Sequence, residues 1–360
     1  MIQVGKWLGY ILLGINAVLA ALLGFSAYSP NWDPHTSPVA SCAGLFFPVL
    51  LILNLFFLLF WLLVYRRYAL LPILILIVCW NSIQTYCPIN GFSGDVPEEA
   101  IKVLSYNTRA FGEKQPHTKD KPNEVLEYLR NCDADIICLQ EYIYGGKLKK
   151  KDIDYALRDY PYRHYHSLGK GLNGLGCYSR YPILSTKPIP YKSNRNGSIV
   201  YYIKVKEDTL VVINNHLESN RIFKADVETY QDMVDAPNSQ NLSSGMRKLL
   251  KKLAEATVRR STQVDKVRET IQSLKGKKLI ACGDFNDTPI SYTHRAMCED
   301  LQDAFVEAGN GLGISYNRNR LYFRIDHILA SKDLKIFDCK VDDSIKASDH
   351  NPIWCFVSLK

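Results

Sequence analysis

The pattern of apolar and polar residues divides the chain near residue 88. Before that position, uncharged apolar runs cover residues 7–28 and 40–64, and each exceeds the roughly 20 residues that a helix needs to cross a bilayer core. A third run, over residues 68–83, is shorter and has Pro72 near its start. We therefore predict a transmembrane module over residues 1–88 with three helices at about these positions. The alternative for the third run is a re-entrant or interfacial hairpin.

The basic residues that flank these runs predict an orientation in the membrane. Lys6 precedes the first run, residues 29–39 contain no Lys or Arg, and Arg66 and Arg67 separate the second run from the third. Because cytoplasmic loops carry an excess of Lys and Arg, the N-terminus is expected inside the cell. We thus expect a multi-pass protein of the cell inner or plasma membrane, with everything after about residue 88 outside the cytoplasm. If the third run does not span, that part is cytoplasmic.

After a linker over residues 89–100, rich in Pro, Gly and polar residues, the pattern changes to short apolar runs separated by turns. Segments with apolar residues at helical spacing predict helices at 122–131, 245–274 and 292–303. Many strands with interspersed helices favour an α/β sandwich of two sheets with outer helices. The predicted strands are 101–107, 135–141, 174–180, 198–205, 209–216, 278–284, 324–331 and 351–358.

Polar residues terminate several of these apolar runs. Asn107, Glu141, His216 and Asp284 each stand at the end of a predicted strand, and the segment 348-SDHNP-352 leads into the last one. Strand ends lie at the rim of a sheet, where a rigid core holds side chains in place. One such residue is usually a turn former, but the set as a whole predicts a site at one rim.

The residue types at this rim suit a divalent cation. Mg²⁺ and Mn²⁺ prefer hard oxygen ligands. Glu141 and Asp349 offer carboxylates, and Asn107 offers an amide carbonyl. We therefore predict that Mg²⁺ or Mn²⁺ is the cofactor and that these three residues belong to its site.

The same rim offers acid–base chemistry. In 284-DFN-286 the strand period of two places Asp284 and Asn286 on one face, so that Asp284 can accept a proton from water while Asn286 orients the water or binds a phosphate. His216 and His350 are expected to donate hydrogen bonds to phosphate oxygens as negative charge develops there. Asp326 is expected to orient His350, as a carboxylate does for a working imidazole.

Charge and cysteine content narrow the choice of partner. The formal net charge is +8, and the segment from Arg221 to Lys278 has 13 Lys and Arg against 7 Asp and Glu, a net +6. A basic surface suits a phosphodiester or a lipid headgroup. The ten cysteines show no zinc-type spacing, and the sequence has no phosphate-binding GxxxxGK loop, HExxH or GxSxG motif.

Seven short motifs follow one another along residues 101–360. They are 105-SYNTR-109, 139-LQE-141, 178-YSRYPI-183, 214-NNHLES-219, 283-GDFND-287, 325-IDHI-328 and 348-SDHNP-352. At these positions the chain resembles the endonuclease/exonuclease/phosphatase superfamily, which has the DNase I-like fold. The resemblance implies a four-layer α/β sandwich that hydrolyses a phosphoester with Mg²⁺ or Mn²⁺ by in-line attack of water.

Individual roles follow from the same resemblance. It implies that Asp284 and Asn286 are the base and its partner, and that His216 binds phosphate or acts as an acid. It also implies that Asp326 and Asp349 support His350. Arg109, at the end of the first motif, is a further candidate for binding the substrate.

The resemblance leaves the substrate open, because the family includes nucleases, inositol-phosphate phosphatases and sphingomyelin phosphodiesterases. The phosphoester is therefore expected in a nucleic acid, a lipid headgroup or an inositol phosphate. A catalytically inactive membrane binding protein is the less favoured alternative. The lipid bilayer is an expected partner, and no obligate protein partner is inferred.

One departure from the family is a basic insert over about residues 219–256, ahead of a helix expected at 257–274. The insert contains 245-GMRKLLKKLAEA-256, in which leucines share one helical face and basic residues lie beside them. Such a helix either lies on a membrane or a polyanion, or packs on the sandwich as a solvated helix.

Overall fold

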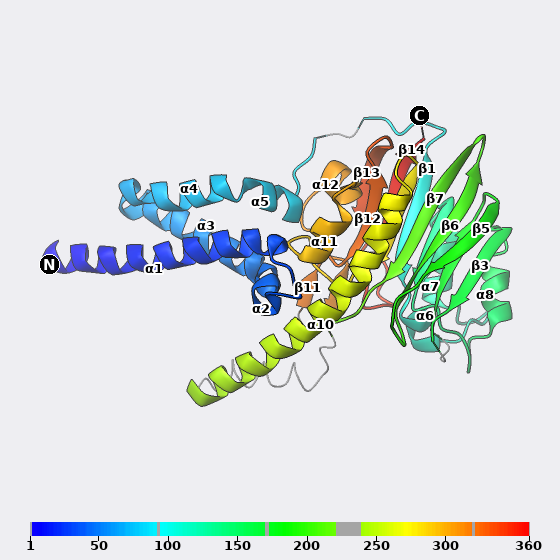
Figure 1. Cartoon of the computed structure of the whole chain (residues 1–360), viewed down its shortest axis with the longest axis horizontal. Helices are drawn as coiled ribbons and strands as arrows, with labels where there is room; N and C mark the ends of the chain where they lie inside the picture. The colour runs from blue at the N-terminus through cyan, green and yellow to red at the C-terminus, as the bar shows by residue number, and fades with distance from the viewer. Residues whose placement is uncertain (1, 92–93, 170–172, 221–238, 319–320, 360) are drawn as a thin grey trace.

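In the computed structural model, two six-stranded sheets lie face to face, with helices on both outer faces (Figure 1). The structure describes residues 2–91, 94–169, 173–220, 239–318 and 321–359. The first sheet has the order β13-β14-β1-β2-β4-β3 and the second has the order β5-β6-β7-β8-β12-β9. This arrangement confirms the predicted four-layer α/β sandwich of the DNase I-like type.

The elements of the sandwich have the following bounds. The first sheet contains β1 (Ile101–Asn107), β2 (Ile136–Gln140), β3 (Tyr162–Ser167), β4 (Gly174–Ser179), β13 (Lys335–Val341) and β14 (Ile353–Ser358). The second contains β5 (Ile183–Ile189), β6 (Gly197–Val205), β7 (Asp208–His216), β8 (Leu279–Asp284), β9 (Leu301–Asp303) and β12 (Asp326–Ser331). A separate hairpin pairs β10 (Tyr316–Arg318) with β11 (Leu321–Phe323). The helices are α6 (Arg109–Lys114), α7 (Glu124–Asn131), α8 (Lys150–Ala156), α10 (Ser239–Ser273), α11 (Tyr292–Met297) and α12 (Ala304–Ala308).

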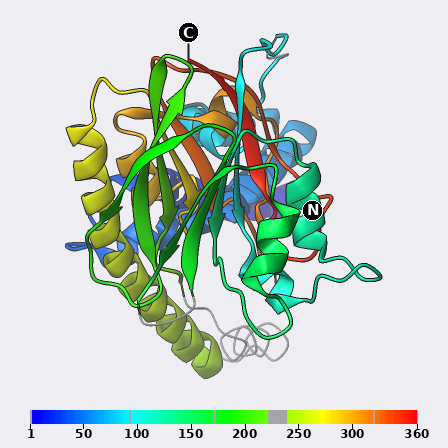
Figure 2. The same ribbon diagram turned by 90° about the vertical axis from the view of Figure 1, so that its right-hand side faces the viewer.

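Three apolar clusters separate the four layers. The central cluster lies between the sheets and contains Cys138 of β2 and Ile280 of β8, both fully buried. A second cluster joins Leu129 of α7 to the first sheet, and a third joins Val267 of α10 to the second. Figure 2 shows α7 and α8 outside one sheet and α10 outside the other. Because both faces of each sheet are buried, the central strands are continuous apolar runs, which is why the sequence reveals them.

Strand pairing brings the polar strand ends to one rim. β1 and β2 are parallel, with Asn107 opposite Gln140, and β7 and β8 are parallel, with His216 opposite Asp284. β12 runs antiparallel to β8 and places Asp326 opposite Asp284. The ends of strands from both sheets thus meet where the sequence predicted a site.

All eight predicted strands are present, each within two residues of its predicted ends. The strands β3, β5 and β13, which were not predicted, each lie at an edge of a sheet. Many side chains of these edge strands are exposed, so the strands lack a continuous apolar run. The sequence pattern that would predict them is therefore weak. The ten cysteines are all free, and Cys138 is a buried core residue as expected.

Two predicted helices differ from the structure. The helix predicted over 292–303 is wrong in its second half, because α11 ends at Met297 and residues 301–303 form β9 beside β12. The helix predicted over 245–274 is present but begins earlier, because α10 runs from Ser239 to Ser273. The part of the predicted insert over 221–238 lies outside the described residues.

The N-terminal helices project from one side of the sandwich (Figure 1). Two stretches, Trp7–Asn31 and Pro38–Val64, are long and apolar enough to cross a membrane by length and composition. The helices are α1 (Ile2–Tyr28), α2 (Pro38–Ser41), α3 (Phe47–Val64), α4 (Leu70–Val78) and α5 (Trp80–Tyr86), with short 3-10 turns η1 (Ser29–Asn31), η2 (Cys42–Phe46) and η3 (Arg66–Ala69). The helical segments Arg66–Val78 and Trp80–Tyr86 meet at an angle of 64°. The expected third span is therefore either one broken span or a re-entrant loop.

Hydrogen bonds and close backbone packing join the N-terminal helices to the sandwich. Arg324, which is 2% exposed, donates to the Thr85 carbonyl over 2.5 Å, and Arg295 Nε donates to the Pro30 carbonyl over 2.9 Å. Gly44 lies so close to the sandwich that a Cβ there would be 1.7 Å from the Ile290 carbonyl oxygen. The segment after α1 and the end of α5 therefore both lie against the sandwich.

Candidate active site

Two residues from opposite sheets form the centre of the candidate site. Asn107 Nδ2, at the end of β1, donates to Asp284 Oδ2, at the end of β8, over 2.9 Å. Both side chains are 1% exposed. Burial raises the pKa of Asp284, while the nearby His350 acts in the opposite direction. Asp284 is thus a buried carboxyl whose Oδ2 is hydrogen-bonded at the junction of the two sheets.

His350 lies between two carboxylates. Its Nδ1 donates to Asp326 Oδ2 over 2.8 Å, and its Nε2 lies 3.8 Å from Asp284 Oδ2. Burial lowers the pKa of His350, but the negative charges of Asp326 and Asp284 outweigh it and raise the pKa to about 10. The ring of Tyr316 packs edge-on against the imidazole, with 5.1 Å between ring centroids. The geometry therefore fits a protonated imidazole that Asp326 orients, as the sequence predicted.

His216 approaches Asp284 from the neighbouring strand. Its Nε2 lies 3.8 Å from Asp284 Oδ2, and its buried Nδ1 has no hydrogen-bond partner among the described residues. Burial lowers the pKa of His216. A neutral imidazole has one N–H that can donate to a phosphate oxygen and one nitrogen that can accept a proton.

Asn286 does not follow the expected strand alternation, because β8 ends at Asp284 and Asn286 adopts a left-handed φ of 53°. Its backbone N–H donates to Asp284 Oδ1 over 2.9 Å, and its side-chain Nδ2 donates to the Leu217 carbonyl over 3.0 Å. Asn286 therefore holds the Asp284 carboxylate directly. Glu141 has a similar left-handed φ of 48°, and such strained conformations of non-glycine residues are common at functional sites.

Gly283 is required for the close pairing of β7 and β8. Its φ is +135°, and a Cβ at this position would lie 1.9 Å from the Asn215 carbonyl oxygen. Only glycine fits such a backbone contact. The glycine before Asp284 thus allows β8 to deliver its carboxylate beside His216.

The three predicted metal ligands differ in their surroundings. Burial raises the pKa of Glu141, with Asn107, Asp349 and His350 near enough to influence it, and no described residue forms an ion pair with its carboxylate. Asp349 is already paired, because its Oδ2 lies 3.1 Å from Arg318 Nη1 and its Oδ1 lies 3.7 Å from Arg109 Nε. Among the described residues, Asp349 thus has two cationic partners and Glu141 has none.

Asn107 and Arg109 complete the predicted site. Asn107 Oδ1 accepts a 3.1 Å hydrogen bond from the backbone N–H of Arg109 and keeps a second lone pair for a cation. Arg109 forms an ion pair with Glu113 and lies in α6, whose residues 110–113 have left-handed dihedrals. The Arg109 side chain is 27% exposed, so it borders the site from its open side.

Two groups of His, Asp and Glu are close enough to hold a cation among the described residues. One is Asp284, Asp326 and His350, in which the imidazole already occupies the space between the carboxylates as a hydrogen-bond donor. The other is His294, Asp303 and His327, which lies behind the site. His294 Nε2 donates to Asp303 Oδ2 over 2.7 Å, and Asp303 Oδ1 caps the start of α12. This second group joins α11, β9 and β12.

Sequence reasoning missed Tyr316 and Arg318, which contact His350 and Asp349. Both belong to β10, a strand of three residues. Its pattern has no apolar run that would predict a strand, and only the fold places it beside the 348–352 segment.

Comparisons with known proteins identify the family of this chain. A family model described as the Endonuclease/Exonuclease/phosphatase family matches residues 104–350, and a second model, a domain of unknown function, matches residues 9–86. An exodeoxyribonuclease from Bacillus subtilis (strain 168) is 24% identical over 294 residues, which cover 72% of this chain and 100% of the relative.

Solved structures show the same fold. An endonuclease/exonuclease/phosphatase from Beutenbergia cavernae superposes with a TM-score of 0.50 at 17% identity, covering 72% of each chain. The human Nocturnin catalytic domain with bound sulfate anion gives a TM-score of 0.50 at 16% identity, covering 73% of this chain and 96% of that one.

Proposed function

The chain belongs to the endonuclease/exonuclease/phosphatase family, whose members hydrolyse phosphoester bonds and generally use divalent metal ions, and from this premise we propose that it is a membrane-anchored phosphodiesterase dependent on Mg²⁺ or Mn²⁺. The observation that carries the proposal is the position of Asp284. Its carboxylate accepts a hydrogen bond from Asn107 and faces the imidazoles of His216 and His350. This is a buried base beside two groups that can stabilise a phosphate.

The reaction proposed for these residues is in-line attack of water on phosphorus. Asp284 accepts the proton of the attacking water, while Asn286 holds the carboxylate in place through its backbone N–H. His350 and His216 donate hydrogen bonds to the phosphoryl oxygens as charge develops there. Asp326 keeps His350 protonated and oriented.

Glu141 and Asn107 are the residues proposed to hold the metal ion, with Asp349 at the edge of that site. When bound, the ion polarises the phosphoryl group and neutralises the leaving oxygen. The Glu141 carboxylate supports this proposed metal site. Burial raises the pKa of Glu141, and the carboxylate has no ion-pair partner among the described residues.

Membrane anchoring is the second part of the proposal. Residues 1–88 form the proposed anchor, residues 89–100 the linker and residues 101–360 the catalytic domain. The segment after α1 and the end of α5 both contact the catalytic domain, through Pro30 and Thr85, while η3, between α3 and α4, lies at the opposite end of the helices (Figure 1). These contacts support three crossings, which would put the N-terminus and the catalytic domain on opposite sides.

A lipid headgroup is the second candidate for the substrate, because an anchor keeps the site close to the bilayer and raises the local lipid concentration. A nucleic acid is favoured by the basic segment from Arg221 to Lys278. We disfavour an inactive binding protein, because the proposed catalytic residues Asp284 and His350 are both present and lie close together, with His350 Nε2 3.8 Å from Asp284 Oδ2.

The test is a substrate screen of the full chain in detergent, with Mg²⁺ or with Mn²⁺. We expect hydrolysis of bis(p-nitrophenyl) phosphate, and comparison of plasmid DNA, RNA, sphingomyelin and inositol phosphates identifies the natural class. Absence of hydrolysis of every phosphoester would contradict the proposal. A reporter fused to the C-terminus tests the topology, and a cytoplasmic signal would contradict three crossings.

A further inference from the structure

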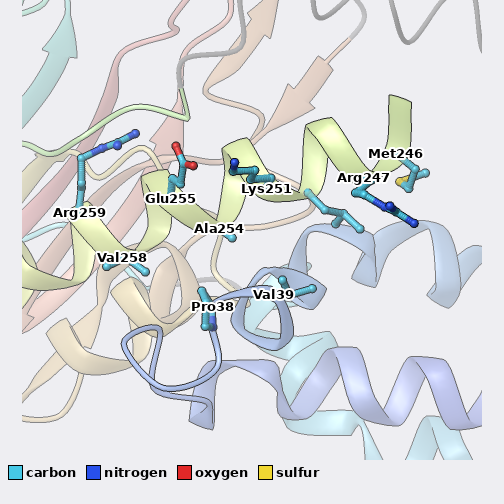
Figure 3. A pocket seen from close by; sticks show the side chains of 10 residues that line it. Pro38, Val39, Met246, Arg247, Lys251, Ala254, Glu255, Val258 and Arg259 are labelled. Atoms are coloured by element: carbon cyan, nitrogen blue, oxygen red, sulfur yellow. The ribbon is translucent and has the colours of Figure 1, made fainter. Parts of the chain in front are cut away.

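A groove lies between the N-terminal helices and the catalytic domain and shares no residue with the active site. Its volume is about 860 Å³. The floor is apolar, with Pro38 and Val39 of α2 on one side and Leu250, Ala254 and Val258 of α10 on the other. Figure 3 shows Ala254 and Val258 pointing across the groove toward Pro38. Val39 remains 54% exposed, so this apolar surface is open to whatever surrounds the protein.

Two basic side chains border the apolar floor. Arg247 and Lys251 line the groove and are exposed, and no described residue forms an ion pair with either. Arg259 is already engaged, because its Nε lies 3.6 Å from Glu218 Oε1. Glu255 and Arg259 point away from α2 (Figure 3). Arg247 and Lys251 thus lie beside aliphatic side chains without an ion-pair partner among the described residues, and Glu255, one helical turn from Lys251, is the one acidic residue in the lining.

The groove stands at the end of the two candidate spans. α2 lies in the connection between α1, which ends at Tyr28, and α3, which begins at Phe47. Tyr28 and Trp32 at this connection are 58% and 37% exposed, and aromatic residues of this kind gather where a bilayer meets water. With the membrane anchoring proposed above, the groove would open at the level of the lipid headgroups.

α10 is fixed in this place by contacts with the same connection. Cys42 packs with Leu253 and Ala254 in one buried cluster, and its sulfur lies 3.5 Å from Thr257 Oγ1. Helix α10 thus packs against the connection between α1 and α3. This contact, rather than packing on the sandwich alone, accounts for the apolar face of the basic segment.

We propose that this groove binds one anionic phospholipid of the bilayer, with its phosphate on Arg247 and Lys251 and an acyl chain along Val39, Leu250 and Val258. The proposal rests on the membrane anchoring described under the proposed function and is independent of the reaction. A nucleic acid or inorganic phosphate would satisfy the charges but leave the apolar floor in water. An uncharged lipid would cover the floor but leave both charges uncompensated.

The lipid site and the active site share one helix. Three residues after Thr257, Arg260 donates to the Glu218 carbonyl over 2.7 Å and to Asp287 Oδ2 over 3.1 Å. Glu218 lies two residues after His216, and Asp287 lies three residues after Asp284. A lipid in the groove would therefore hold the helix that supports both loops of the active site.

The test is native mass spectrometry of the detergent-purified full chain with added dioleoyl phosphatidylglycerol or dioleoyl phosphatidylcholine. The wild type should retain the anionic lipid in preference to the zwitterionic one. Each basic side chain near an anionic headgroup contributes about fivefold in affinity, so Arg247→Glu with Lys251→Glu should weaken phosphatidylglycerol binding by at least about 30-fold. Val39→Trp, which fills the floor without changing charge, should also reduce binding.

The matched control is Lys275→Glu with Lys277→Glu, which changes the net charge equally at two exposed positions beyond the end of α10. It should bind phosphatidylglycerol as the wild type does. Equal retention of the two lipids by the wild type, or undiminished binding by the groove double variant, would overturn the inference. Two further assays on the same proteins separate the proposals. Alkaline extraction of membranes tests the anchoring, and hydrolysis of bis(p-nitrophenyl) phosphate tests the reaction, so a failure of either is distinguished from a loss of lipid binding in the groove.

Discussion

The side-chain amide of Asn107 in one sheet donates a 2.9 Å hydrogen bond to Asp284 in the other, across 177 positions of sequence. The proposed base is therefore held from the opposite sheet as well as by its own loop. The position of this carboxylate depends on the packing of the two sheets, which explains why a strand end can serve as a pre-organised site.

Removal of that amide tests its role directly. In Asn107→Ala, Asp284 loses a hydrogen bond that lowers its pKa, and Glu141 loses a neighbour at the proposed metal site. We expect kcat for bis(p-nitrophenyl) phosphate to fall by roughly 10²-fold, as for other transition-state hydrogen-bond donors, and the acid limb of the pH profile to move to higher pH. Asn123→Ala, which removes the N-cap of α7, should lower the melting temperature and leave kcat unchanged. Similar kcat losses in both variants would contradict a specific role.

Asp326→Asn keeps the shape of the side chain but removes its charge. With Asp326 ionised, the pKa of His350 is raised to about 10 despite burial, so the protonated donor is present at neutral pH and lost as pH rises through that value. Without the charge, burial lowers the pKa, and the alkaline limb of kcat should move toward neutral pH. We expect a loss of at least about 10²-fold at pH 8, within the usual contribution of a positioned acid or base. An unchanged alkaline limb would exclude His350 as the titrating group.

Gly283→Ala tests the close pairing of β7 and β8. The new Cβ would lie 1.9 Å from the Asn215 carbonyl at a φ of +135°, and we expect at least about 3 kcal/mol of destabilisation from the combined clash and strain. Gly276→Ala is the control, because Gly276 has a φ of +83° and open space around its Cβ position. It should cost only about 1 kcal/mol. Equal shifts in melting temperature would show that the contact with Asn215 is unimportant.

The sequence predicts the central part of this fold better than its edges. Runs such as β1 and β8 are buried on both faces, and their polar ends indicate the rim where Asp284 lies. Edge strands such as β5 are largely exposed and give no comparable signal. The helix predicted over 245–274 begins earlier in the structure, at Ser239, and no local pattern reveals that its residues Leu253 and Ala254 pack with Cys42.

The site was predicted as a set of residue types rather than as a geometry. The tie between His350 and Asp326 follows from two motifs and is present at 2.8 Å. Other features of the site depend on contacts that the sequence pattern does not show. Asp349 is paired with Arg318 of β10. The left-handed φ of Asn286 ends the strand alternation from which its orientation was predicted.

The pair of His294 and Asp303 predicts how stability depends on pH. Burial lowers the pKa of His294, but the Cys298 sulfur and the hydrogen bond to Asp303 outweigh it and raise the pKa to about 10. The contribution to stability is full below the unfolded pKa of about 6.5 and is lost as pH rises toward 10. The melting temperature of the wild type should therefore fall between pH 7 and 9.5. Loss of the His294 proton alone contributes at most about 1.4 kcal/mol of lost stability per pH unit.

The comparison is with His294→Gln, which should show a flatter curve over the same range. His164→Gln is the control, because burial lowers the pKa of His164 and its replacement should leave the slope intact. Equal slopes in the wild type and His294→Gln would show that this pair does not hold the extra proton.

The measurement that tests the central claim most directly is the rate of bis(p-nitrophenyl) phosphate hydrolysis by the full chain, with Mg²⁺, after EDTA, and after Mg²⁺ is restored. Asp284→Asn, which keeps the shape of the base but cannot accept a proton, is measured beside the wild type and beside Asp342→Asn, a carboxylate that hydrogen-bonds Tyr128 away from the site. We predict a rate that disappears in EDTA, returns with Mg²⁺, falls at least about 10³-fold in Asp284→Asn and is unchanged in Asp342→Asn. A rate that persists in EDTA, or that survives in Asp284→Asn, would contradict the account.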